Sequence, residues 1–154
     1  MGHAAERRAG AQLGAARPRG PGRPLILVVD ASAAIWAAMS EAGPDVLGPE
    51  LVAPPLLWSE VYAGLHVRLW KGTMRRSDVE ASRQRFGAMP IERRQHDDLH
   101  AEAWAIAEEL GVARTYGCEY LALARLLGTK VVTLDGRLRR GADRLGLVTD
   151  PTEL

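Results

Sequence analysis

Three acidic side chains have the type and spacing to bind a metal ion together. Asp30 directly follows the aliphatic run 25–29, Asp135 directly follows the apolar segment 130–134, and Glu60 lies among apolar residues. Burying a charged side chain beside an apolar strand costs free energy unless the charge is paired or binds an ion. Clustered carboxylates without a basic partner suit hard cations such as Mg²⁺ or Mn²⁺. Such ions neutralise a phosphodiester and generate hydroxide near neutral pH, which is the chemistry of a nuclease.

A structural interpretation of the same acids is also open. Asp30 could cap a helix, and Asp135 followed by Gly136 is ordinary turn chemistry. The distinction depends on the elements that position these residues.

Strands and helices alternate along the chain, which predicts an α/β fold with a parallel sheet covered on both faces. The predicted strands are short apolar segments: residues 25–29, 51–53, 89–91, 130–134 and 146–148. The predicted helices show apolar periodicity or end signals: residues 31–41, 56–71, a helix from Ser77, 97–110 and 119–127. In such a sheet the functional crevice lies beyond the carboxyl ends of the strands, where Asp30 and Asp135 fall.

Local signals support three of these helices. Leucine and valine recur every fourth residue in the segment 56–71, which predicts one buried stripe. Ser77 and Glu80 match a capping box at a helix start. Asp97 and Asp98 are acids suited to the first turn of the helix 97–110.

Composition limits the classes of protein. A chain of 154 residues with 47% apolar and 25% charged residues is typical of one globular domain. The longest aliphatic run, 25–29, is far shorter than the roughly 20 residues of a membrane-spanning helix. One cysteine, Cys118, excludes a disulfide framework, and we expect a cytoplasmic protein.

The first 24 residues differ in composition from the rest. They are rich in Ala, Gly, Arg and Pro and hold five arginines against one glutamate. We expect a disordered basic leader at 1–24 and a single domain at 25–150. An RNA-binding arm, or a start codon placed too far upstream, are the alternatives for the leader.

Four segments, in order, resemble the PIN domain, and in particular the VapC toxins of bacterial toxin–antitoxin pairs. They read Val-Val-Asp-Ala-Ser from 28, Pro-Leu-Leu-Trp-Ser-Glu-Val from 55, Thr-Tyr-Gly-Cys-Glu-Tyr-Leu-Ala-Leu-Ala from 115 and Val-Thr-Leu-Asp-Gly-Arg-Leu from 132. The resemblance implies a three-layer α/β/α fold around a parallel sheet of four to five strands. It also implies a Mg²⁺- or Mn²⁺-dependent endoribonuclease, typically dimeric and silenced by a cognate antitoxin.

The resemblance assigns roles to individual residues. Asp30, Glu60 and Asp135 match the family's metal-binding acids, and Ser32 and Thr133 match polar positions near the site.

One position departs from the family pattern. Gly117 stands where the family has a further aspartate. Glu119, two residues later on the same helix, should face elsewhere and is not a relocated ligand. Glycine near a helix start costs the fold at most about 1 kcal/mol. Loss of even an outer ligand partner costs about 10–100-fold in metal affinity or activity. We therefore expect weakened nuclease activity; the alternative is an inactive PIN-fold protein that binds antitoxin or RNA.

Basic and aromatic residues carry weaker signals. Arginines crowd the middle of the chain, and Arg75 and Arg76 are candidates to contact RNA phosphates, with a solvated helix face as the alternative. Three tryptophans at helical spacing with apolar neighbours favour core or dimer contacts over base-stacking platforms: Trp58, Trp70 and Trp104.

Two other sites have little support in the sequence. His96 and His100 are four residues apart, as in a zinc protease helix, but aspartate follows His96 where that motif needs glutamate. A phospho-acceptor domain with Asp30 as the acceptor lacks the expected acidic pair and late lysine.

Overall fold

The computed structural model describes residues 25–48 and 50–154, and it has the parallel sheet that the sequence predicts. Its five strands are short and mostly apolar: β1 (Ile26–Val29), β2 (Glu50–Ala53), β3 (Ile91–Arg93), β4 (Val131–Val132) and β5 (Val148–Thr149). They lie in the order β3-β2-β1-β4-β5, and every neighbouring pair is parallel. The prediction of an α/β fold with four to five parallel strands is confirmed.

β1 is the central strand, with neighbours on both sides. Val28 lies in register with Val52 of β2 and Val131 of β4. All three side chains are fully buried. A central parallel strand is covered on both faces, which explains why β1 is an uninterrupted aliphatic run.

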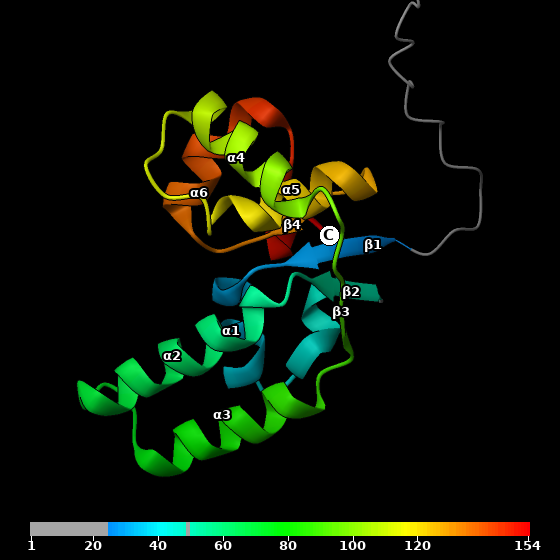
Figure 1. Cartoon of the computed structure of the whole chain (residues 1–154). Coiled ribbons are helices and arrows are strands. Elements are labelled where there is room, and N and C mark those ends of the chain that lie inside the picture. The colour runs from blue at the N-terminus through cyan, green and yellow to red at the C-terminus, as the bar shows by residue number, and fades with distance from the viewer. Residues whose placement is uncertain (1–24, 49) are drawn as a thin grey trace, which may run out of the picture.

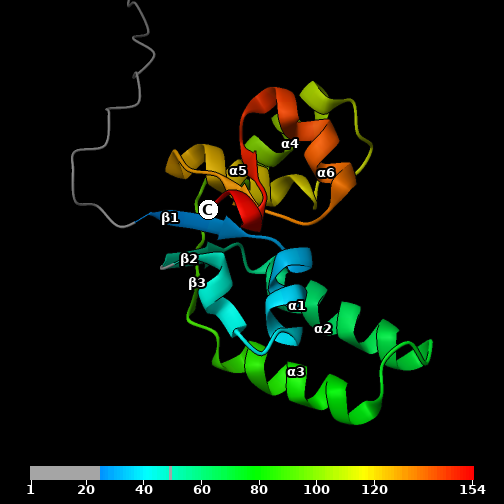
Figure 2. The ribbon, with the colours of Figure 1, turned by 180° about the vertical axis from the view of Figure 1, so that it is seen from behind.

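Helices cover both faces of the sheet and make three layers (Figures 1 and 2). The bounds of the helices, with three 3₁₀ helices, are α1 (Ala31–Met39), η1 (Gly43–Leu47), α2 (Leu56–Trp70), α3 (Arg76–Ala88), α4 (Leu99–Leu110), α5 (Cys118–Leu127), α6 (Gly136–Ala142), η2 (Asp143–Leu145) and η3 (Pro151–Glu153). The first layer holds α1, α2 and α3, and the other holds α4, α5 and α6.

The apolar stripe of α2 packs into the core as predicted. Leu57, Val61 and Leu65 are fully buried. α1 contributes small alanines to the same layer, and α2 approaches it closely at Gly64. A Cβ atom at Gly64 would lie 2.7 Å from Cδ1 of Ile35, so a larger residue there would require the Ile35 side chain to move.

Two predicted helix starts are wrong. α3 begins at Arg76 with Arg75 before it, and no side chain caps it. The hydroxyl of Ser77 lies inside the first turn and donates to Asp78 Oδ1 at 3.4 Å, so Ser77 forms no capping box. α4 begins at Leu99, two residues after the predicted start, and the acid of its first turn is Glu102.

The tryptophans do not all pack in the core. Trp58 is partly buried and lies against Phe86, with ring centroids 6.4 Å apart. Trp70 is 84% exposed and Trp104 is 62% exposed, so neither packs in the core, and of the two predicted roles the dimer contact stays a prediction for both. Trp70 is the last residue of α2 and faces away from its buried stripe, and the Trp104 indole donates to Glu108 Oε1 on the surface of α4.

Two expectations concern the chain as a whole. The predicted leader, 1–24, lies outside the residues that the structure describes. Of the described helices, none is both long and apolar enough to cross a membrane.

Candidate active site

One pocket collects the three predicted acids from separate parts of the chain. Asp30 comes from the end of β1, Glu60 from α2, and Asp135 from the segment after β4. The pocket therefore lies beyond the carboxyl ends of the two central strands, as the topology predicts. The other residues that line it are Ala31, Ser32, Ala63, Tyr116, Gly117, Tyr120 and Leu138.

Asp30 is positioned by the junction between β1 and α1. Its backbone is extended, with φ −93° and ψ 172°, so the residue ends the strand and caps the helix. The backbone N–H of Ala33 donates to Asp30 Oδ1 at 2.9 Å. The residue is only 5% exposed, so its carboxylate is held almost entirely by protein groups.

Two hydroxyl groups fix the Asp30 carboxylate further. Ser32 Oγ donates to Oδ1 at 2.7 Å, and Thr133 Oγ1 donates to Oδ2 at 2.5 Å. Each hydroxyl in turn accepts a backbone N–H from the segment after β4: Ser32 from Leu134 at 2.9 Å and Thr133 from Asp135 at 3.0 Å. Ser32 and Thr133 thus tie the end of β4 to Asp30 and orient its carboxylate.

Glu60 is held by a tyrosine that the sequence analysis did not single out. Tyr120 on α5 donates its phenolic O–H to Glu60 Oε2 at 2.5 Å. This bond joins the two helical layers across the pocket. Tyr120 follows Tyr116 by four residues, a spacing that brings two side chains to the same face of a helix. This spacing was the one signal in the sequence that could have pointed to Tyr120.

Asp135 lies at the start of α6 and is exposed. Its Oδ1 accepts the backbone N–H of Arg137 at 2.8 Å and that of Leu138 at 3.4 Å. Asp135 is therefore a helix cap, and it also presents its carboxyl group to the pocket.

Burial is the main cause of raised pKa values at Asp30 and Glu60, and neighbouring acids add to it. Burial raises the pKa of Asp30 above its ordinary value, against the lowering effect of its three hydrogen bonds, and the charge of Asp135 adds to the rise. Burial also raises the pKa of Glu60, while the Tyr120 hydrogen bond lowers it and the charges of Asp30 and Glu119 raise it. The starts of α1, α5 and α6 all border the pocket, and the positive ends of helix dipoles offset part of this repulsion.

Gly117 lies at the start of α5 and leaves open space in the pocket. Its φ of −65° and ψ of −22° suit any residue. A Cβ atom at this position would meet no atom within 4 Å. The backbone therefore does not require glycine, and the Cβ atom of an aspartate would meet no neighbour.

The ligand atoms available in the pocket are of the type that a hard divalent cation prefers. Three carboxylates line the pocket, and no lysine, arginine or histidine is among its described lining residues. Oxygen donors of this type are the preferred ligands of Mg²⁺ and Mn²⁺. Within residues 25–48 and 50–154, however, no three acidic, histidine or cysteine side chains are close enough to form a ready ligand group. The oxygen donors are therefore of the right type for the cation, but the three carboxyl groups do not form a ready-made ligand set.

Other predicted candidates lie away from this pocket. Arg75 and Arg76 are exposed at the turn between α2 and α3 and do not line it. Glu119 also does not line it, and its Oε1 lies 3.8 Å from Nε2 of the exposed His100.

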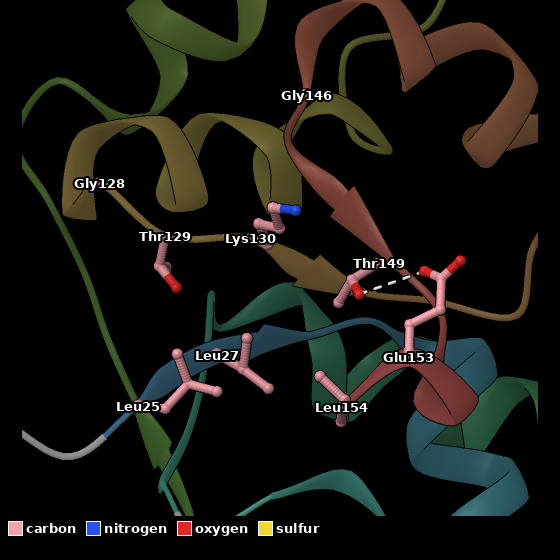
Figure 3. A pocket seen from close by; sticks show the side chains of 9 residues that line it. All are labelled: Leu25, Leu27, Gly128, Thr129, Lys130, Gly146, Thr149, Glu153 and Leu154. Carbon is pink, nitrogen blue, oxygen red and sulfur yellow. Dashed lines mark hydrogen bonds between the residues drawn. The ribbon is translucent and has the colours of Figure 1, made fainter.

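A second pocket lies beside the starts of β1 and β4 and the C-terminal residues of the chain (Figure 3). Glu153 is the only acidic side chain among its lining residues, and it accepts a hydrogen bond from Thr149 at 3.4 Å. Its lining is Leu25, Leu27, Gly128, Thr129, Lys130, Gly146, Thr149, Glu153 and Leu154. Without clustered carboxylates, this pocket has no comparable capacity for a metal ion.

Comparison with known proteins agrees with the fold. The PIN domain family matches residues 27–144, a span that includes all three acids. No curated protein matches the chain. Because the match covers most of the chain, the protein belongs to the PIN domain family, a family of nucleases.

Proposed function

We propose that the protein is a VapC-like toxin, a Mg²⁺- or Mn²⁺-dependent endoribonuclease that hydrolyses RNA phosphodiester bonds. The observation that carries the proposal is that Asp30, Glu60 and Asp135 line one pocket with no basic residue among its described lining residues. The motifs around these residues support the choice of VapC within the family.

The roles of the residues follow from their contacts. Asp30, Glu60 and Asp135 would hold the cation, which when bound neutralises phosphate charge and lowers the pKa of water. Ser32 and Thr133 keep the Asp30 carboxylate oriented, and each hydroxyl accepts a hydrogen bond from a backbone N–H group after β4.

Gly117 sets the expected strength of the activity. The pocket has space for a fourth carboxylate but lacks one. We therefore propose a weakened enzyme. The same observation favours a second candidate, a catalytically inactive PIN-fold protein that binds antitoxin or RNA.

A cleavage assay tests the enzyme directly. The purified full chain is incubated with single-stranded RNA in Mn²⁺, in EDTA, and as the variant Asp30→Asn. We expect slow cleavage that both EDTA and the substitution abolish. Cleavage that persists in EDTA would refute the metal mechanism.

Expression toxicity separates the two candidates. Growth arrest that Asp135→Asn relieves would support the enzyme, whereas arrest that the substitution leaves unchanged would support binding alone.

The partners follow from the VapC interpretation. We propose RNA as substrate, a cognate antitoxin, a homodimer and a cytoplasmic location. A neighbouring gene for a small DNA-binding protein would support the antitoxin, and light scattering of the purified chain would measure the oligomeric state.

A further inference from the structure

The outer face of α2 leads from the candidate active site to an exposed tryptophan. Ala63, Val67 and Trp70 follow Glu60 by three, seven and ten residues, a spacing that places all four on one side of a helix. Ala63 lines the pocket with Glu60. Val67 is 46% exposed and Trp70 is 84% exposed. We call Ala63, Val67 and Trp70 the outer α2 face.

The distance along this face suits an extended strand of nucleic acid. Ten residues of α-helix rise by about 15 Å, so Trp70 lies a few nucleotides from Glu60 along the helix axis. Figures 1 and 2 both show α2 and α3 projecting beyond the sheet, with the turn between them at the far end. A strand seated in the pocket and running along α2 would reach this turn.

Basic residues follow the tryptophan in the turn at the end of α2. Lys71 follows it directly, and Arg75 and Arg76 lie just across the turn; all three are exposed. Among the described residues, Lys71 and Arg75 form no ion pair, and Arg76 has only a 4.0 Å contact with Glu80. An open indole face beside unpaired cations is the arrangement that binds single-stranded nucleic acid by base stacking and phosphate contact.

We infer that the outer α2 face binds single-stranded RNA, with a base stacked on Trp70 and phosphates beside Lys71 and Arg75. The inference rests on the proposed RNA substrate and extends it to a subsite away from the reacting phosphate. It makes the protein selective for unpaired RNA, because paired bases in a duplex do not offer their faces to an indole.

Binding in EDTA tests the inference without cleavage. A fluorescently labelled single-stranded RNA of about 12 nucleotides is titrated with the full chain and its anisotropy is measured. We expect Trp70→Ala to weaken binding about 5- to 150-fold and Trp70→Phe to retain most of the affinity. Lys71→Gln should make the slope of log affinity against log salt shallower by about 0.7.

Trp104→Ala is the matched control. Trp104 is also exposed, but it lies on α4 and its indole N–H is already bonded to Glu108. We expect this variant to bind RNA as the native chain does. A blunt RNA duplex of the same length should bind the native chain and Trp70→Ala equally.

The outcomes separate this inference from the proposed function. If the native chain binds and cleaves RNA but Trp70→Ala binds as tightly, the inference fails and the proposed function stands. If Trp70→Ala turns a dimer into a monomer in sedimentation, Trp70 is a subunit contact and the inference fails. If the native chain neither binds nor cleaves RNA, both fail.

Discussion

Restoring a carboxylate at position 117 should increase both metal affinity and nuclease activity. Gly117→Asp adds a side chain to an open part of the pocket, since its Cβ would meet no atom within 4 Å. The backbone there has a negative φ, so the substitution adds no strain. Loss of a partner of a bound metal costs about 10–100-fold, and we expect a gain of at least that size in the cleavage rate.

Stability in the absence of metal should change little. A negative charge at the start of α5 gains about 0.3–1 kcal/mol from the helix dipole. Repulsion from Asp30, Glu60 and Asp135 opposes this gain. In saturating Mn²⁺ the Gly117→Asp variant should be more stable than the native chain. A metal site that binds 10–100-fold more tightly adds about 1.4–2.7 kcal/mol to the free energy of unfolding.

The assay compares cleavage of one single-stranded RNA by several variants in Mn²⁺. Gly117→Asn supplies the shape of the side chain without its charge and should remain slow. Gly87→Asp, on the exposed side of α3 where a Cβ atom also meets nothing within 4 Å, controls for the added charge. Equal rates for the native chain and Gly117→Asp would refute the reasoning, as would equal rates for the Asn and Asp variants.

Three further substitutions test how the acids are held. Because burial raises the pKa of Asp30 from 3.8, its protonated form stabilises the metal-free fold at low pH, and this contribution is lost as pH rises through the raised pKa. Asp30→Asn should therefore gain stability relative to the native chain as the pH rises above about 4 in urea denaturation with EDTA, and a difference that stays constant with pH would contradict the pKa shift. Tyr120→Phe removes the hydrogen bond to Glu60 and should lower the free energy of unfolding by about 1.5 kcal/mol; an unchanged urea midpoint would show that the bond contributes nothing. Asp135→Ser keeps a helix-capping oxygen but removes the charge, so cleavage should be lost while the melting temperature stays within a few degrees; retained cleavage would remove Asp135 from the metal site.

The sheet and two of the acids were predictable because both depend on short stretches of sequence. An aliphatic run such as 25–29 indicates a strand buried on both faces, and the residue after a parallel strand lies at the edge where sites form. The stripe of Leu57, Val61 and Leu65 was equally local, and it correctly predicted the buried face of α2.

Features that depend on tertiary contacts were missed. The bond between Tyr120 and Glu60 joins residues 60 positions apart, and no local pattern pairs them. Trp70 has the apolar neighbours of a core residue, yet it is the last residue of α2 and its side chain is 84% exposed in the part of the chain that the structure describes. The capping box at Ser77 failed because α3 begins at Arg76, which places Ser77 inside the first turn.

The hydrogen bonds of Asp30 decide between two interpretations of this residue: a helix cap, or a carboxylate that is held in place to bind a cation. A cap needs one acceptor for one backbone N–H, and the bond from Ala33 fulfils that role. Capping explains neither the donors Ser32 and Thr133 nor the burial that raises the pKa of the carboxyl group. Asp135, by contrast, is exposed and bonded only as a cap would be, so its functional role depends on its place in the pocket. Since a serine could cap α1 without the cost of burying a charge, the network around Asp30 is better explained by a carboxylate held ready for a cation.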